Sequence, residues 1–251
     1  MQNLIKKLVH RGEHLLSEPF RPSEFTKHEE SDRLLNDLDH YPHALVLACV
    51  MDRGMSAEKA WSIPYGFKTR LGSFEFRHLQ KLSVDEVKRL MSKPTPLHRW
   101  PQRMAKNFHS AIQLIAEKYS GNASSIWRDY PASATLVRRF LEFDGIGVKI
   151  ANMAANILVR EMKIPVRDET SIDVSPDVQV LRVFKRLGLL RTEAKKEELI
   201  YRARELNPRY PGVFDRPAWK IGRSWCRPQN PRCGECYMSD CCPTHTRSQT
   251  K

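Results

Sequence analysis

The sequence lacks the long apolar run that a membrane-spanning helix needs. No stretch of the 251 residues approaches about 18 consecutive apolar side chains. The first ten residues, which include Lys6, Lys7 and His10, are too short and too interrupted by polar side chains for a secretory segment. We therefore expect a cytoplasmic protein without membrane contact.

Strand-like segments, internal repeats and low-complexity tracts are also missing. The apolar run 42–51 could be a buried strand or a helix, but its Ala, Leu and Met content favours a helix, and no second strand-like run exists to pair with it. Helical patterns recur along the chain, with a capping box at Ser83–Glu86 and an amphipathic stretch over 104–119 that Gly121 ends. The sequence predicts an all-α protein of about ten helices.

Acidic residues are too few to balance the basic ones. Lys and Arg number 42 against 29 Asp and Glu, which gives a formal net charge of +13. A basic excess suits a polyanionic partner such as nucleic acid, although basic proteins without such ligands exist. At this length, the chain can form one large domain or two modest ones.

Cysteine is almost absent until the end, where five of the six cysteines fall within the last 26 residues. Cys226, Cys233, Cys236 and Cys242 are spaced C-x6-C-x2-C-x5-C. Four thiolates so close in sequence can bind one metal centre, either a [4Fe–4S] cluster or zinc, and free thiols are the third alternative. Only one short C-x2-C pair is present, which favours the cluster. Cys241 is an alternative to Cys242, and Cys49 fits an apolar core.

A glycine turn, Gly145-Ile146-Gly147-Val148, joins two helical runs and is followed by Lys149. Glycine enters left-handed conformations cheaply, and free amides at a helix N-terminus bind anions such as phosphate. Lys149 could be a reactive amine or only a phosphate contact.

Downstream, Asp177 precedes the helical run 178–187 and fits an N-cap; Asp173 is a second candidate carboxylate. Arg227 and Arg232 lie in the short loop between the first two clustered cysteines. They could contact phosphate or stay solvated.

The hairpin, the aspartate that opens the next helix and the cysteine spacing together resemble the endonuclease III branch of the helix-hairpin-helix DNA glycosylases. Asp177, Arg182 and Val183 match the family's Asp-x-x-x-x-Arg-Val signature, and Gly222-Arg223 leads to Cys226 as in the family. The resemblance is firm from about residue 136 to 242.

The resemblance implies a two-domain architecture. A helical barrel domain would cover 36–168, with the helix-hairpin-helix motif at about 136–160. A discontinuous helical domain would combine 1–35 with 169–251 and end in the [4Fe–4S] cluster loop at 226–242. We expect a monomer.

The implied function is base-excision repair on double-stranded DNA that contains a damaged or mismatched base or an abasic site. The enzyme would flip the base, cleave its N-glycosidic bond and nick the abasic site by β-elimination. Lys149 would form the Schiff base and Asp177 would be the catalytic aspartate. Two alternatives stay open: a monofunctional glycosylase without lyase activity, and a non-catalytic iron–sulfur DNA-binding protein.

The chain departs from the family in two places near these residues. The interval from Lys149 to Asp177 is longer than usual, so 160–176 is an insertion whose residues 167–169 could touch DNA. The family's Ser-Ala-Gln-x-Thr segment falls near Met51–Ser56, where no glutamine occurs. Arg53 could fill the gap left by a flipped base instead, and Asp52 could read the base. Lesion specificity therefore stays open.

Overall fold

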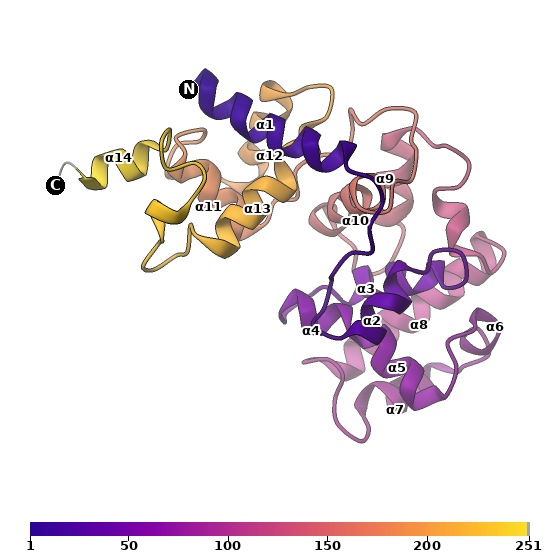
Figure 1. The fold of residues 1–251 in the computed structure, drawn as a ribbon. Coiled ribbons are helices and arrows are strands. Elements are labelled where there is room, and N and C mark those ends of the chain that lie inside the picture. The colour runs from indigo at the N-terminus through magenta and orange to yellow at the C-terminus, as the bar shows by residue number, and fades with distance from the viewer. Residues whose placement is uncertain (250–251) are drawn as a thin grey trace. The chain divides into compact units, whose positions relative to one another are not determined.

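A computed structural model describes residues 1–249, and these residues form helices and connecting loops without any strand. Sequence patterns therefore predicted the all-α class correctly, although short helices raise the count above ten. None of the described helices combines the length and apolarity needed to cross a membrane. The helices, labelled in Figure 1, are α1 (Gln2–Ser17), α2 (Glu29–Asn36), α3 (Pro42–Met51), α4 (Ala57–Trp61), α5 (Ile63–Leu71), α6 (Phe76–Leu79), α7 (Val84–Ser92), α8 (Pro101–Lys118), η1 (Ala123–Ile126), α9 (Ser133–Leu141), α10 (Val148–Arg160), α11 (Val178–Arg186), α12 (Lys196–Leu206), η2 (Pro211–Phe214), α13 (Asp215–Ser224), η3 (Cys233–Glu235) and α14 (Pro243–Gln249).

The chain divides into two compact units, each of which is discontinuous in sequence. Unit 1 comprises Met1–Pro19, Ala132–Val137 and Ala155–Lys251, and unit 2 comprises Phe20–Pro131 and Arg138–Ala154. Unit 1 therefore contains both α1 and the cysteine-rich segment. Unit 2 contains the glycine turn with Lys149.

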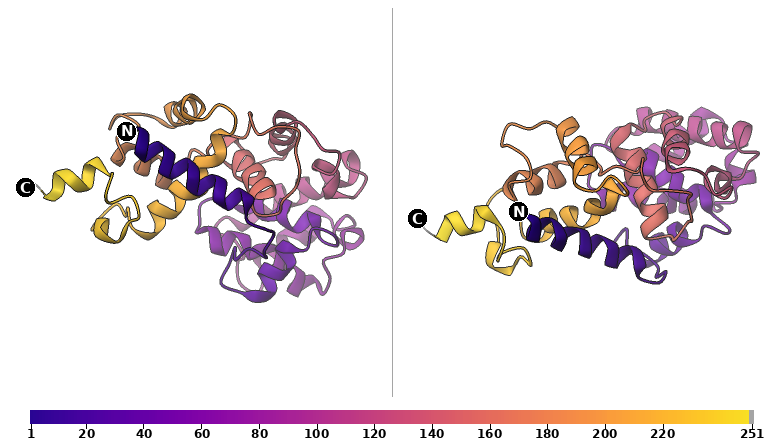
Figure 2. Two further views of the ribbon diagram at one scale, coloured as in Figure 1. Left: turned by 45° about the horizontal axis from the view of Figure 1, so that its top comes forward. Right: turned by 90° about the horizontal axis from the view of Figure 1, so that it is seen from above.

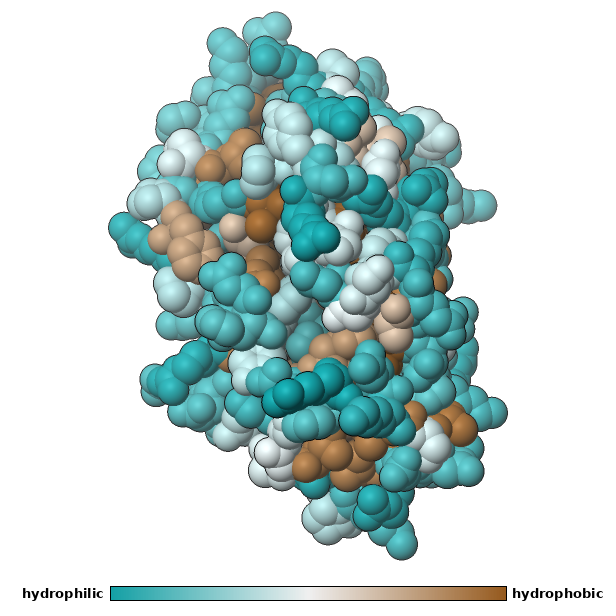
Figure 3. All heavy atoms as spheres, turned by 90° about the vertical axis from the view of Figure 1, so that its right-hand side faces the viewer, coloured by the Kyte–Doolittle hydropathy of each residue, from teal (hydrophilic) through white to brown (hydrophobic). Residues whose placement is uncertain are grey.

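Unit 2 is built around α3, whose ten residues are all buried. This explains why the run 42–51 shows no polar face: α8 and other helices of the unit surround it. Phe67 and Phe108 meet in this core with ring centroids 4.7 Å apart. The predicted capping box at Ser83 and Glu86 is formed and fixes the start of α7. The face drawn in Figure 3 is mainly hydrophilic, with apolar side chains in small patches.

His43 is a buried titratable group within this core. It is 2% exposed, and its Nε2 lies 2.8 Å from the carbonyl oxygen of Phe74. Removal from water disfavours the charged imidazolium and lowers the pKa of His43 to about 4. His43 is therefore neutral in the folded protein at neutral pH.

Residues 20–35 belong to unit 2, which differs from the predicted domain boundary at residue 36. The packing gives the reason. Phe25 stacks on Trp61 with ring centroids 4.8 Å apart. His28 lies against Tyr65, with ring centroids 4.8 Å apart. These long-range contacts attach the segment to unit 2, and no local sequence pattern predicts them.

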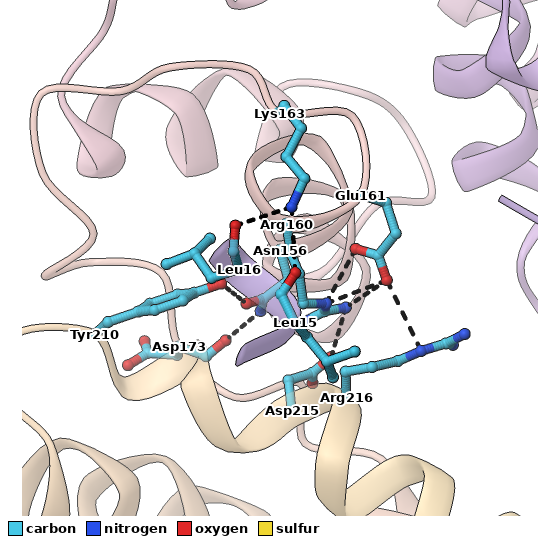
Figure 4. A network of polar contacts seen from close by, with 10 residues as sticks. All are labelled: Leu15, Leu16, Asn156, Arg160, Glu161, Lys163, Asp173, Tyr210, Asp215 and Arg216. Atoms are coloured by element: carbon cyan, nitrogen blue, oxygen red, sulfur yellow. Dashed lines mark hydrogen bonds and ion pairs between the residues drawn. The ribbon is translucent and has the colours of Figure 1, made fainter. Parts of the chain in front are cut away.

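Unit 1 contains α11, α12 and α13, with α1 packed alongside α13 (Figure 2). Its interior includes a polar network, drawn in Figure 4. Asn156 donates to the carbonyl of Asp173 at 2.8 Å and accepts from the hydroxyl of Tyr210 at 2.8 Å. The fully buried Arg160 contacts Glu161 at 3.0 Å and lies 4.0 Å from Asp215. Buried charges need such partners.

Candidate functional site

The hairpin turn follows α9 and is anchored by two buried side chains, Phe143 and Ile146. Gly145 has φ +88°, and the side-chain amide of Asn107 lies 2.4 Å from the position of a Cβ, so both backbone angle and space require glycine. In contrast, no described atom lies within 4 Å of a Cβ added to Gly147, and Val148 is 50% exposed. The turn therefore presents Gly147 and Val148 outward at the N-terminus of α10.

Lys149 is the second residue of α10, and its partner within unit 2 is Asp52. Nζ lies 3.1 Å from Oδ2 of Asp52, and the side chains are 39% and 7% exposed respectively. Asp52 is the C-cap of α3, where its backbone N–H donates to the carbonyl of Cys49. A buried carboxylate is thus in direct contact with the amine that the sequence singled out.

The side chain of Arg53, the next residue, contacts the hairpin. Its Nη2 donates a 2.7 Å hydrogen bond to the carbonyl of Gly145. The Arg53 carbonyl in turn lies 2.9 Å from Nε2 of His98, whose Nδ1 accepts from the backbone N–H of Trp100 at 3.0 Å. Gly54 lies against the Trp100 ring, which leaves no space for a Cβ. The loop after α3 is therefore fastened to both the hairpin and the start of α8.

Asp177 caps α11 in unit 1, as the sequence predicted. Its Oδ1 accepts from the backbone N–H of Gln179 at 2.7 Å. Asp173, the alternative carboxylate, has a different environment: Arg204 donates to its two oxygens at 2.7 and 2.8 Å, and Asp173 is buried. Asp173 is thus one half of a bidentate ion pair.

The cysteine-rich segment begins at the end of α13, and four of its thiols line one cavity in unit 1. Arg186 and His245 also line this cavity, whose cysteines are Cys226, Cys233, Cys236 and Cys242. Cys241 is not among the lining residues; its thiol donates to the carbonyl of Met238 instead. Among the described residues, no three His, Cys, Asp or Glu side chains converge as ligands of a single ion. Four thiols spread around one cavity suit a multi-atom cluster better than one zinc ion.

Arg186 links the two ends of the cysteine loop. It donates to the carbonyls of Arg227 and Pro228 at 2.6 and 3.0 Å, and its Nη1 lies 3.5 Å from Sγ of Cys226. Its own carbonyl accepts from the hydroxyl of Thr244 at 2.5 Å. The loop is therefore held on α11 at both ends.

Comparisons with known proteins find relatives in both sequence and fold. No protein-family model matches the chain. Endonuclease III-like protein 1 of Gallus gallus is 26% identical over 156 residues, which cover 61% of this chain and 48% of that protein. Endonuclease III of Thermotoga maritima is 26% identical over 146 residues, 58% of this chain and 59% of that protein. The chain thus spans about half the length of the curated relatives it matches.

Solved structures with the same fold include a trapped covalent intermediate of endonuclease III with DNA, which superposes with a TM-score of 0.64 at 16% identity over 99% of both chains. A thermostable thymine-DNA glycosylase gives a TM-score of 0.64 at 14% identity over 98% of both chains. The likeness therefore extends over nearly the whole chain. The chain therefore has the fold of these DNA glycosylases and is similar in sequence to endonuclease III-like proteins.

The two arginines predicted in the cysteine loop differ in their contacts. Arg232 donates to the carbonyl of Ser224 at 3.0 Å and pairs with Glu235 at 3.0 Å. Arg227 instead lines an open hollow together with Arg223 and Gln179. Arg223 was not predicted as a phosphate contact from the sequence. Its position three residues before Cys226 could have indicated that it lies beside the cysteine loop.

The segment 160–176, which the resemblance predicts to be an insertion, is largely tied into unit 1. Asp168 accepts from the hydroxyls of Ser133 and Thr170 at 2.5 and 2.6 Å. Hydrogen bonding to Ser133 and Thr170 lowers the pKa of Asp168. This carboxylate therefore organises the loop against the start of α9.

Proposed function

We propose that this protein is a base-excision repair DNA glycosylase that also cleaves abasic sites. It would bind double-stranded DNA containing a damaged or mismatched base, flip that base from the stack and break its N-glycosidic bond. Flipping is needed because the bond is inaccessible inside a duplex. Acting on DNA, the protein would work in the compartment that holds the chromosome.

The observation that carries the proposal is an outward-facing hairpin turn, suited to bind phosphate, with Lys149 directly behind it. Gly145, Ile146, Gly147 and Val148 form a turn whose outward side is open at Gly147. Amides at a helix N-terminus attract a phosphate, and the net charge of +13 favours DNA generally. A primary amine beside bound backbone phosphate can reach the sugar carbon of the same nucleotide.

In the proposed reaction, the neutral Lys149 amine attacks C1′ of the flipped nucleotide. The new C–N bond forms as the C1′–N bond to the base breaks, and the base leaves with that electron pair and takes up a proton. The bound nitrogen loses a proton, and its electron pair forms a C=N bond to C1′ as the C1′–O4′ bond of the sugar ring breaks and O4′ takes up a proton. The resulting Schiff base permits β-elimination, in which a proton leaves C2′ and the C3′–O bond to the 3′ phosphate breaks. Asp177 would stabilise positive charge that develops on the sugar and assist proton transfer.

We propose that Cys226, Cys233, Cys236 and Cys242 hold a [4Fe–4S] cluster. The shared cavity supports this assignment, as does the exclusion of Cys241 from its lining. When bound, the cluster would fix the loop between Cys226 and Cys233 and so present Arg227, with Arg223 beside it, to DNA phosphate. Arg232 would act through the same loop, which it braces through Ser224.

Incubation with duplexes that carry a panel of lesions, mismatches and abasic sites tests the proposal, with base release and strand nicking measured separately. We expect base release from at least one substrate and nicking at abasic sites. Base release without nicking would show that the protein is a monofunctional glycosylase without lyase activity. Binding without any product at enzyme excess would instead indicate a non-catalytic DNA-binding protein.

A further inference from the structure

Asp52 has no role in the reaction proposed above, although its carboxylate contacts the amine of Lys149, the proposed nucleophile. Its Oδ2 is 3.1 Å from Lys149 Nζ, within direct ion-pair and proton-transfer distance. Both residues belong to unit 2, so the pair is complete within one compact unit. Asp177 belongs to unit 1.

The end of α3 and the start of α10 each disfavour the charge of the side chain located there. Asp52 lies at the C-terminus of α3, where the helix dipole is negative, and Lys149 lies in the first turn of α10, where the dipole is positive. Each helix end thus opposes the ionised form of its side chain. Moving one proton from the ammonium to the carboxylate removes both unfavourable charges together.

The position of Asp52 is fixed from several sides. Arg53 is bonded to the Gly145 carbonyl at 2.7 Å, and His98 lies 2.9 Å from the Arg53 carbonyl. Gly54 packs on Trp100, and its φ of +67° suits only glycine well. These contacts hold the loop after α3 against the hairpin, so the fold keeps the Asp52 backbone beside the start of α10, within reach of Lys149.

Other titratable groups adjoin the pair within unit 2. Cys49 is fully buried; burial raises its pKa, with a smaller contribution from the charge of Asp52, so the thiol stays neutral. Burial also lowers the pKa of His98, which favours its neutral form. Arg53 is permanently charged, and its guanidinium donates a hydrogen bond to the Gly145 carbonyl. Among these neighbours, Asp52 is the group suited to accept a proton from Lys149.

We propose that Asp52 is the proton acceptor that activates Lys149 and positions its amine, an inference that rests on the proposed lyase function. One proton passes from the Nζ ammonium to Oδ2, and the freed electron pair on Nζ forms the bond to C1′. As the C1′–N bond breaks, its electron pair leaves with the base. The base then takes the proton from the Asp52 carboxyl, which returns to carboxylate.

The test is the rate at which the full-length protein forms a covalent adduct with abasic-site DNA in the presence of sodium cyanoborohydride, measured from pH 6 to pH 9 at saturating enzyme. A positioned general base typically contributes about 100-fold or more. We therefore expect Asp52→Asn to slow adduct formation by about that factor at neutral pH. Its rate should rise more steeply with pH than that of wild type, since solvent must then remove the proton. Asp52→Glu, which keeps the carboxylate, should recover part of the rate.

Asp85→Asn is the matched control because Asp85 also pairs with a lysine of unit 2, Lys88, at 2.6 Å, but on the exposed surface of α7. It should leave the adduct rate unchanged. Circular dichroism and DNA affinity confirm that each variant is folded and binds.

Each of three outcomes would overturn the proposal. Equal rates and equal pH profiles for Asp52→Asn and wild type would make Asp52 a structural partner only. Faster trapping by Asp52→Asn would mean that the carboxylate holds Lys149 as ammonium and restrains it. A wild-type protein that forms no adduct at any pH would remove the lyase function together with the role of Asp52, and this outcome is distinct from the first two.

Discussion

Arg53 donates a 2.7 Å hydrogen bond from Nη2 to the carbonyl oxygen of Gly145, which joins the loop after α3 to the turn of the hairpin. From sequence, Arg53 is expected to fill the gap left by a flipped base. The hydrogen bond adds a role within the protein itself. Because Asp52 is the preceding residue and contacts Lys149, this bond also steadies the carboxylate beside the proposed nucleophile.

Replacement of Arg53 by Ala should loosen the hairpin even without DNA. A hydrogen bond from a charged donor that is partly exposed contributes about 1–2 kcal/mol, so amide exchange over residues 143–148 should accelerate by about 5- to 30-fold. Hydrogen exchange followed by mass spectrometry measures this change. Arg33→Ala, on the exposed surface of α2, is the control. Unaltered exchange in the hairpin would leave Arg53 with a DNA contact alone.

His43 should make the stability of unit 2 depend on pH. Its folded pKa of about 4 lies below the usual value of 6.5 for a histidine in water, so the unfolded chain binds the proton first as the pH falls. Stability is thus complete above pH 6.5 and decreases by up to about 1.4 kcal/mol per pH unit as the pH falls towards 4. Urea unfolding at several pH values should show a smaller slope for His43→Gln than for wild type.

His10→Gln is the control for that experiment, since His10 is exposed on α1. The comparison uses slopes rather than absolute stabilities, because His43→Gln also loses the stacking of the imidazole on Phe74. Identical pH slopes in wild type and His43→Gln would contradict the assignment of a neutral buried His43.

Substitution of Asp173 should affect the stability of the protein, whereas substitution of Asp177 should affect its catalytic activity. Asp173→Asn weakens a buried, bidentate pair with Arg204 and should lower the free energy of unfolding by about 1–3 kcal/mol. Asp177→Asn should keep α11 capped, because Asn and Asp are comparable N-caps, yet lose base release. Thermal unfolding and single-turnover base release measure the two effects. Retained base release in Asp177→Asn would remove Asp177 from the mechanism.

Cys241 and Cys242 are neighbours that should behave differently. Cys242 lines the cavity shared with Cys226, Cys233 and Cys236, so Cys242→Ser should reduce the broad visible absorbance and the iron and sulfide content of the purified protein. Cys241→Ser should leave both unchanged. Loss of iron in Cys241→Ser with retention in Cys242→Ser would reverse the assignment, and stoichiometric zinc without iron in wild type would exclude the cluster.

Features coded by adjacent residues were predictable from the sequence. The capping box at Ser83 and Glu86, the cap at Asp177 and the left-handed Gly145 each depend on a few neighbouring side chains. The apolar run 42–51 also indicated a buried helix correctly, because an all-apolar segment has no solvent face.

Features that depend on residues far apart in sequence were not predictable. Asp52 and Lys149 are separated by 97 positions, and only the fold brings their charges into contact. Residues 20–35 join unit 2 through Phe25, which stacks on Trp61, and His28, which lies against Tyr65, and no local pattern reveals these partners. Similarly, Arg160 is fully buried among acidic partners, although a charged residue at the end of a helix ordinarily suggests the surface.

Borohydride trapping of the wild-type protein on lesion-containing or abasic DNA, with the adduct mapped by mass spectrometry, tests the central claim most directly. The account predicts a stable covalent complex attached through Lys149, absent in Lys149→Ala and retained in Lys88→Ala, where the replaced lysine lies on α7. An adduct that persists in Lys149→Ala, or nicking of abasic DNA without any adduct, would contradict the assignment of Lys149 as the nucleophile.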